Sequence, residues 1–151
     1  MLDPIVKSVE VPCTCEQAFN IFINDVSSWW PLDKNSVSAM NGNVAKKVVI
    51  EARTGGRVYE IGHDDQEHHW GTVTQHDPYN SFTMDWHIGL SAESPSEVSV
   101  VFTDAGSGKT KVELTHSRWE SFGDKAEDMR NGYNSGWVGV FEEAYKQACG
   151  A

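Results

Sequence analysis

The chain has 151 residues, which suits one domain with a substantial core, and its 22 acidic and 12 basic side chains give a formal net charge of -10. This charge argues against nucleic acid and anionic membranes as partners, because both attract clustered positive charge. The N-terminal sequence lacks a basic segment before an apolar run, and no apolar run approaches the roughly 20 residues of a membrane span, so we expect neither a signal peptide nor a membrane segment. Three cysteines, an odd number without a disulfide framework, predict a cytoplasmic location.

The first elements are a strand and two helices. Ile5 to Val11 alternates between apolar and polar residues and predicts a strand, which Pro12 ends. Thr14 and Gln17 have the spacing of a capping box at the start of a helix. The apolar stripe of that helix is Ala18, Phe19, Phe22 and Ile23. Val26 to Trp30 predicts a further short helical turn before a proline.

A polar stretch from Asn35 to Asn43 is predicted to be a loop, and strand patterns follow it in series. Gly55-Gly56 is typical of a hairpin turn between the first two strands. The predicted strands are Val44 to Ala52, Arg57 to Gly62, His69 to His76, Ser81 to Leu90, Glu97 to Thr103 and Thr110 to Trp119. In Val44 to Ala52 and in His69 to His76, the alternation does not decide which residues face inward.

After a break at Ser121 to Gly123, the apolar period changes from two to about 3.6, which predicts one long helix. Its apolar face is Met129, Tyr133, Trp137, Val140, Phe141 and Ala144. Asp124 with Glu127 is the expected N-terminal cap, and Gly150 the C-terminal stop. Gly132 and Gly136 each cost about 0.5–1 kcal/mol relative to alanine in a helix, so we expect another group to approach the backbone there.

These elements predict a single α+β domain over residues 1–151. Alternating strands form an antiparallel sheet with one solvated and one covered face, and only the C-terminal helix is long enough to cover it. We therefore expect a curved antiparallel sheet wrapped around a long C-terminal helix, in the order strand, two helices, six strands, helix.

Several motifs, in this order and spacing, resemble one known family across nearly the whole chain. They are Trp29-Trp30-Pro31-Leu32, Gly55-Gly56-Arg57-Val58-Tyr59-Glu60, Trp70-Gly71-Thr72-Val73 with Asp77-Pro78, Phe82-Thr83-Met84-Asp85-Trp86, Leu114-Thr115-His116 with Trp119, Gly132-Tyr133 and Gly136-Trp137. The order of elements resembles the helix-grip fold of the START/Bet v 1-like superfamily, also called SRPBCC. The motifs resemble its branch of activator of heat-shock protein 90 ATPase homologues.

The resemblance implies a cavity between helix and sheet, often filled by an apolar small molecule. It does not imply one activity, because the superfamily includes lipid carriers, hormone receptors, cyclases, ring-hydroxylase domains and co-chaperone domains. A true co-chaperone also carries a separate N-terminal domain, for which we expect no room in this chain. We therefore do not expect a chaperone partner.

The aromatic residues are the first candidates for a ligand site, since indole N–H and phenol O–H groups add polar contacts to large apolar surfaces. Trp86 and Trp137 fit a pocket wall and a filled core equally well. Trp29 and Trp30 precede a loop and are predicted to lie at the rim or lid of a pocket.

Two polar residues are predicted on covered strand faces, His116 and Glu60. They either anchor the polar end of a ligand or are a hydrogen-bonded core histidine and an edge glutamate. The densest set of metal-ligand residue types is His63, Asp64, Asp65, Glu67, His68 and His69. It falls on a polar turn where such side chains point into solvent, so we expect no metal site and no cofactor.

No nucleophile, zinc-protease, phosphate-loop or dinucleotide motif is present, and we assign no catalytic residue. The leading hypothesis is a non-enzymatic protein that binds a small apolar or amphipathic molecule. Its predicted ligand contacts are Trp30 at the mouth, Glu60, Met84, Trp86, His116, Tyr133, Trp137 and Phe141. The alternatives are a cyclase or dehydratase that uses His116 and Glu60 as acid and base, and a co-chaperone-like module. The sequence is also compatible with a homodimer.

Overall fold

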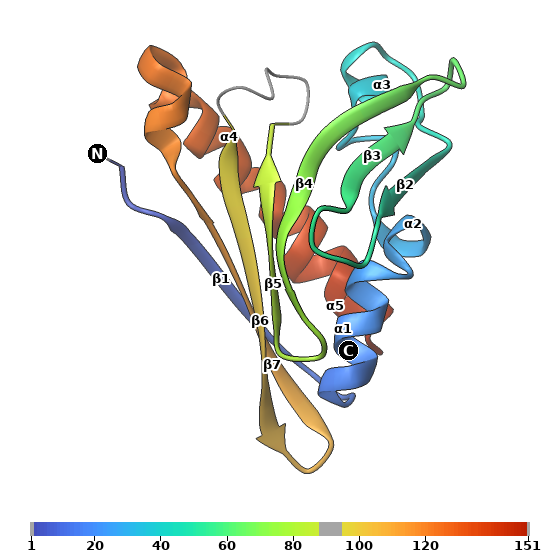
Figure 1. Cartoon of the computed structure of the whole chain (residues 1–151), viewed down its shortest axis with the longest axis vertical. Coiled ribbons are helices and arrows are strands. Elements are labelled where there is room, and N and C mark those ends of the chain that lie inside the picture. Colours follow the sequence, from blue (N-terminus) through green and yellow to red (C-terminus); the bar gives the residue numbers. More distant parts are fainter. Residues whose placement is uncertain (1, 88–94, 151) are drawn as a thin grey trace.

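The structure is a computed structural model that describes residues 2–87 and 95–150. Its centre is one seven-stranded sheet in which every neighbouring pair is antiparallel, in the order β1-β7-β6-β5-β4-β3-β2 (Figure 1). The strands are β1 (Ile5–Val11), β2 (Lys47–Ile50), β3 (Arg57–Ile61), β4 (Glu67–Asp77), β5 (Ser81–Trp86), β6 (Ser96–Gly106) and β7 (Lys109–Ser117).

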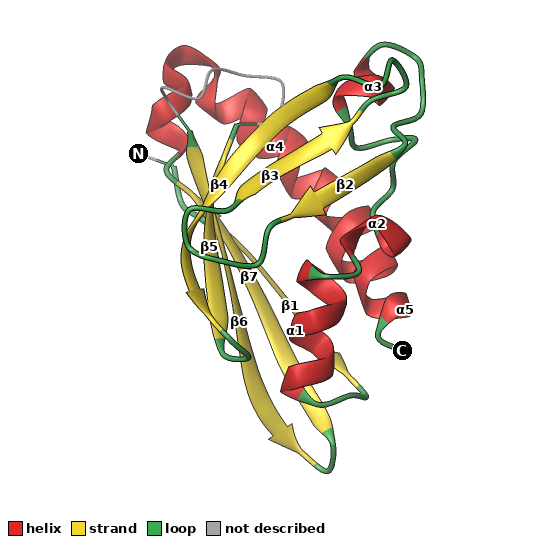
Figure 2. Cartoon of the chain, turned by 45° about the vertical axis from the view of Figure 1, so that its right-hand side comes forward, coloured by secondary structure: helices red, strands yellow, loops and turns green. Residues whose placement is uncertain are grey.

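The C-terminal helical region crosses one face of the curved sheet, and α1 lies beside its last part (Figure 2). The helical segments are α1 (Cys15–Ile23), α2 (Val26–Trp29), α3 (Val37–Met40), the 3-10 segment η1 (Trp119–Lys125), α4 (Ala126–Trp137), the π-helical segment η2 (Val138–Tyr145) and α5 (Lys146–Ala148). The predicted α+β helix-grip architecture is confirmed. None of the helices in the described ranges is both long and apolar enough to cross a membrane.

Several local predictions are confirmed. Thr14 and Gln17 form the complete capping box of α1. On β5, Phe82, Met84 and Trp86 are all buried, as their alternation predicts. The predicted continuation of this strand to Leu90 lies outside the described residues.

The largest difference from prediction is the short helix α3, which lies within the expected loop. The Ser36 side chain caps it by accepting a hydrogen bond from the backbone N–H of Ala39 at 2.9 Å. A helix of one turn contains too few residues to show a helical period, so the pattern could not reveal it. The following strand, β2, is correspondingly shorter than predicted and covers only Lys47–Ile50.

The C-terminal helix also differs in detail. The strand before it, β7, ends at Ser117, and η1 precedes the helix. Lys125 occupies the N-cap position of α4 without a side-chain hydrogen bond, so the cap predicted from Asp124 and Glu127 is wrong. From Val138 to Tyr145 the helix widens into the π-helical segment η2, which the regular 3.6-residue period does not predict.

One glycine, Gly71, allows β4 and β5 to lie unusually close to each other. A Cβ atom at Gly71 would lie 1.9 Å from the backbone oxygen of Asp85, so only glycine lets β4 approach β5 this closely. Trp70 and Trp86 flank this contact, and their rings lie 5.8 Å apart.

Candidate ligand pocket

A pocket of about 400 Å³ lies between α4 and the segment from residue 30 to 40. This volume is within the range of roughly 300–1,000 Å³ that is usual for small-molecule sites. Its lining residues are Trp30, Lys34, Asn35, Ser36, Met40, Trp86, Asp128, Met129, Gly132, Tyr133, Gly136, Trp137 and Val140. Helix α4 and the segment from residue 30 to 40 therefore border a space that the sheet alone does not form.

Three indole rings form the aromatic wall of this pocket. The ring centroids of Trp30 and Trp86 are 5.9 Å apart, and both lie about as close to Trp137, at 6.0 and 5.7 Å. All three side chains are buried, with exposed fractions of 7%, 2% and 3%. Trp30 therefore belongs to the wall of the pocket and does not lie at its mouth. At these separations the rings pack against one another, and together they give the pocket an apolar aromatic surface.

Two glycines on α4 leave the space that the pocket occupies. Among the described residues, a Cβ atom at Gly132 would meet no atom within 4 Å, and one at Gly136 would meet only Nδ2 of Asn35, at 3.8 Å. The expected close approach of another group to the backbone is therefore not made by any described residue. Both glycines line the pocket, so a larger side chain at either position would take up part of its volume.

Trp86 and Tyr133 contribute the polar atoms of the inner lining. The Nε1 atom of Trp86 is buried and has no hydrogen-bond partner among residues 2–87 and 95–150. Such an atom costs about 1–3 kcal/mol when it stays unpaired. Burial raises the pKa of Tyr133 to about 12, and a polar contact with the Trp86 side chain partly opposes this rise. The two groups are thus neighbours, although their geometry falls short of a hydrogen bond.

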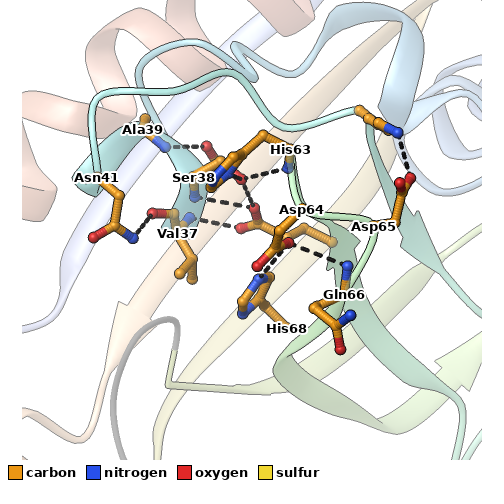
Figure 3. Close-up of polar contacts among 12 residues, drawn as sticks. Val37, Ser38, Ala39, Asn41, His63, Asp64, Asp65, Gln66 and His68 are labelled. Carbon is orange, nitrogen blue, oxygen red and sulfur yellow. Dashed lines mark hydrogen bonds and ion pairs between the residues drawn. The ribbon is translucent and has the colours of Figure 1, made fainter.

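The carboxylate of Glu60 holds α3 in place and makes no contact with the pocket. Its Oε1 atom accepts hydrogen bonds from the Val37 N–H at 2.6 Å and the Trp70 Nε1–H at 2.9 Å. Its Oε2 atom accepts from the N–H and the hydroxyl of Ser38, at 3.1 and 3.0 Å (Figure 3). The His63 N–H in turn donates to the Ser38 hydroxyl at 3.0 Å. Four donors satisfy this fully buried carboxylate, and they position the helix that borders the pocket.

His116 lies behind the aromatic wall and is fully buried. Its Nδ1 atom accepts a hydrogen bond from Trp137 Nε1–H at 3.1 Å. Its Nε2 atom lies 2.7 Å from the Ser96 hydroxyl, which donates to the backbone oxygen of Trp86 at 2.8 Å. Nε2 therefore carries the proton, and burial lowers the pKa of His116 to about 3. The imidazole is neutral and orients two residues of the pocket wall.

The structure separates the predicted ligand contacts into two groups. Trp30, Trp86, Tyr133 and Trp137 line the pocket together. Glu60, Met84, His116 and Phe141 are buried outside its lining, and Met84 instead faces a second cavity of about 10 Å³. Alternation and helical period identify covered faces, but they do not say where along a covered face the packing leaves space.

The residues that pattern reasoning missed lie mainly around α3. Lys34, Asn35, Ser36 and Met40 line the pocket, and on α4 Asp128 joins them. The only available indication was Ser36, since serine is a preferred N-cap.

The polar turn between β3 and β4 is largely solvent-exposed, as its composition predicts. Asp64 accepts a hydrogen bond from the Gln66 N–H at 3.1 Å and lies 3.5 Å from Nε2 of His68, and Asp65 forms an ion pair with Lys46 (Figure 3). Within the described part of the chain, no group of three or more histidine, cysteine, aspartate or glutamate residues is arranged to hold a metal ion.

The family model described as "Activator of Hsp90 ATPase homolog 1-like protein" matches residues 12–143. The chain belongs to this family. The expected resemblance to an SRPBCC-type fold is thereby confirmed. No curated protein sequence matches the chain.

Solved structures similar to this family member include two at about a quarter sequence identity. An anthrahydroquino-gamma-pyrone synthase, Txn09, is 26% identical, with 97% of each chain covered and a TM-score of 0.67. The self-sacrificing resistance protein CalC from Micromonospora echinospora is 25% identical over 97% of this chain and 93% of that one, with a TM-score of 0.71. An HSP90 activator from Plasmodium falciparum, PFC0360w, is 19% identical over 90% of this chain and 93% of that one, with a TM-score of 0.53, and shares the fold alone.

Proposed function

We propose that this protein binds a small, flat and largely apolar molecule in the pocket between α4 and α3. The observation that carries the proposal is the pocket of about 400 Å³, which has an aromatic wall of three tryptophans and two glycines of α4 in its lining. A helix that only covered the core would gain stability from a side chain at Gly132, where a Cβ atom meets no described residue within 4 Å. The retained space is useful to the protein only if another molecule enters it.

The similar structures support a small-molecule role more than a chaperone role. Txn09 is named for an anthrahydroquinone, which is a planar aromatic skeleton, and it is 26% identical to this chain. The similarity to the Hsp90 activator is lower, at 19%. We therefore place the co-chaperone hypothesis behind ligand binding.

Catalysis in the same pocket is the second candidate, and the similarity to a synthase favours it. The acid and base predicted from sequence are not the groups for such a reaction, because His116 and Glu60 lie outside the lining and their hydrogen bonds are satisfied by protein groups. A reaction would have to use polar residues of the lining, such as Tyr133 or Asp128.

A substitution that fills the pocket tests the proposal. Fluorene, a flat tricyclic hydrocarbon, is the probe, and equilibrium dialysis measures its binding. We expect saturable binding to the wild-type protein and its loss in Gly132→Leu, because the new side chain occupies the pocket. Stability is expected to stay at or above the wild-type level, since leucine is the better helix former.

Asn131→Leu is the matched control. It places the same side chain one residue earlier on α4, at an exposed position outside the pocket lining, and should leave fluorene binding unchanged. Unsaturable binding to the wild type, or equal binding to Gly132→Leu, would contradict the proposal.

A further inference from the structure

We infer that the ligand carries a carbonyl-type oxygen, which is held between the indole N–H of Trp86 and the phenol O–H of Tyr133. This inference rests on the proposed function and adds the chemical class of the ligand. It defines a polar subsite in an otherwise aromatic pocket, so the ligand would be an aromatic ketone or quinone and not a pure hydrocarbon.

The first support is the unpaired donor on the pocket wall. Trp86 is 2% exposed and lines the pocket, and its Nε1 atom finds no partner in the described part of the chain. An indole nitrogen can only donate a hydrogen bond, so the group that satisfies it must be an acceptor. Buried polar groups are paired in nearly all native proteins, and the pocket is where a partner can arrive.

The second support is the neighbouring hydroxyl of Tyr133. It lies next to the Trp86 indole, whose polar contact opposes the rise in its pKa, and both side chains line the pocket. Burial keeps this phenol protonated at neutral pH, so it is available as a second donor. Two adjacent donors that face one space are arranged for a single oxygen with two lone pairs.

The charge of the lining favours a neutral oxygen over a carboxylate. Among the described residues of the lining, the only cationic side chain is Lys34, which is exposed, and Asp128, also exposed, adds a negative charge. The inner wall consists of Trp30, Trp86 and Trp137. A carboxylate there would lose its hydration without gaining a counter-charge, whereas a ketone oxygen needs only the two hydrogen bonds.

Trp119 shows that an unpaired indole alone would not be enough. Its Nε1 atom is equally without a partner among the described residues, and its side chain is 1% exposed. However, Trp119 does not line the pocket and packs against Phe122, His116 and Tyr133. What distinguishes Trp86 is the pocket that it lines. Trp119 therefore supplies a matched control.

The test compares fluorenone with fluorene, two flat tricycles of nearly the same shape that differ in one carbonyl oxygen. Equilibrium dialysis should show that the wild-type protein binds fluorenone about tenfold more tightly, the usual size of one or two net hydrogen bonds. Trp86→Phe and Tyr133→Phe should each bring the two affinities towards equality by weakening fluorenone and not fluorene. Trp119→Phe should keep the full preference.

The wild-type protein provides a measurement that does not depend on folding of the variants. In heteronuclear NMR, fluorenone should move the Trp86 indole resonance downfield, as expected on forming a hydrogen bond, and fluorene should not. The Trp119 indole resonance should show no downfield shift specific to fluorenone.

The outcomes separate this inference from the proposed function. Equal binding of both probes to the wild type overturns the donor pair and leaves ligand binding intact. A preference that survives in either Trp86→Phe or Tyr133→Phe also overturns the pair. Failure of both probes to bind overturns the inference together with the proposed function.

Discussion

The two ends of the interface between the C-terminal helix and the sheet are equally aromatic, but only one of them is hollow. At the end near α1, Phe22 lies 5.2 Å from Phe82 and 5.0 Å from Tyr145, and the Phe141 and Tyr145 rings stack at 5.6 Å. These four side chains are almost completely buried and fill the space. At the other end the tryptophan wall borders the pocket.

The difference arises from the residues of the helix and not from the sheet. Towards the filled end the helix supplies Phe141 and Tyr145 from its π-helical segment, whereas at the hollow end α4 supplies Gly132 and Gly136. Aromatic content therefore does not indicate a pocket by itself. Whether an aromatic cluster is a filled core or borders a pocket depends on how much side-chain volume the helix packed against it contributes.

The largest expected effect is at the filled end. Phe141→Ala should lower the free energy of unfolding by about 3–5 kcal/mol, because it creates a cavity in a well-packed cluster. Met129→Ala, at the half-buried rim of the hollow end, should cost much less. Urea denaturation measures both. Equal losses would show that the two ends do not differ in packing as the structure implies.

An intermediate effect is expected at Glu60, which links β3 to the pocket border. Glu60→Gln should lower the free energy of unfolding by about 2–3 kcal/mol, since an amide cannot accept all the hydrogen bonds of the carboxylate and leaves buried donors unpaired. Urea denaturation is again the measurement, and Glu67→Gln at an exposed ion pair should change little.

The same Glu60→Gln variant should also weaken fluorene binding, because α3 borders the pocket and loses its anchor. A stable Glu60→Gln protein with unchanged binding would show that α3 does not depend on this carboxylate.

The smallest effect in the range to be measured is a dependence of stability on pH that comes from His116, about 2 kcal/mol between about pH 7 and about pH 5. Its pKa is about 3 in the folded protein and about 6.5 in an unfolded chain, so on acidification the unfolded chain binds a proton that the folded protein excludes. The stabilisation is complete above about pH 6.5 and is lost towards about pH 3, by about 1.4 kcal/mol per pH unit.

Urea denaturation between about pH 7 and about pH 5 measures this loss, in a range where most carboxylates stay ionised. His116→Gln lacks the titrating group, so its stability should fall less steeply than that of the wild type. Parallel curves for the two proteins would contradict the buried, neutral state of His116.

The sequence was sufficient for the architecture, because period-2 and period-3.6 patterns depend only on which residues face a common core. They identified every strand of the sheet, the capping box at Thr14 and the inward face of β5. For the site they named the aromatic wall and Tyr133, but they placed Trp30 at the mouth and selected Glu60 and His116 as ligand contacts.

Tertiary structure alone decided which covered residues border empty space. Whether His116 and Glu60 meet a ligand or protein groups depends on Ser96, Trp137 and the backbone of α3, which come from distant parts of the chain. The position of the pocket depends likewise on α3, a one-turn helix too short to show a period. It also depends on Gly132 and Gly136, beside which the described residues leave space. Periodicity records which side of an element is covered, whereas a cavity is a property of volumes summed over several elements.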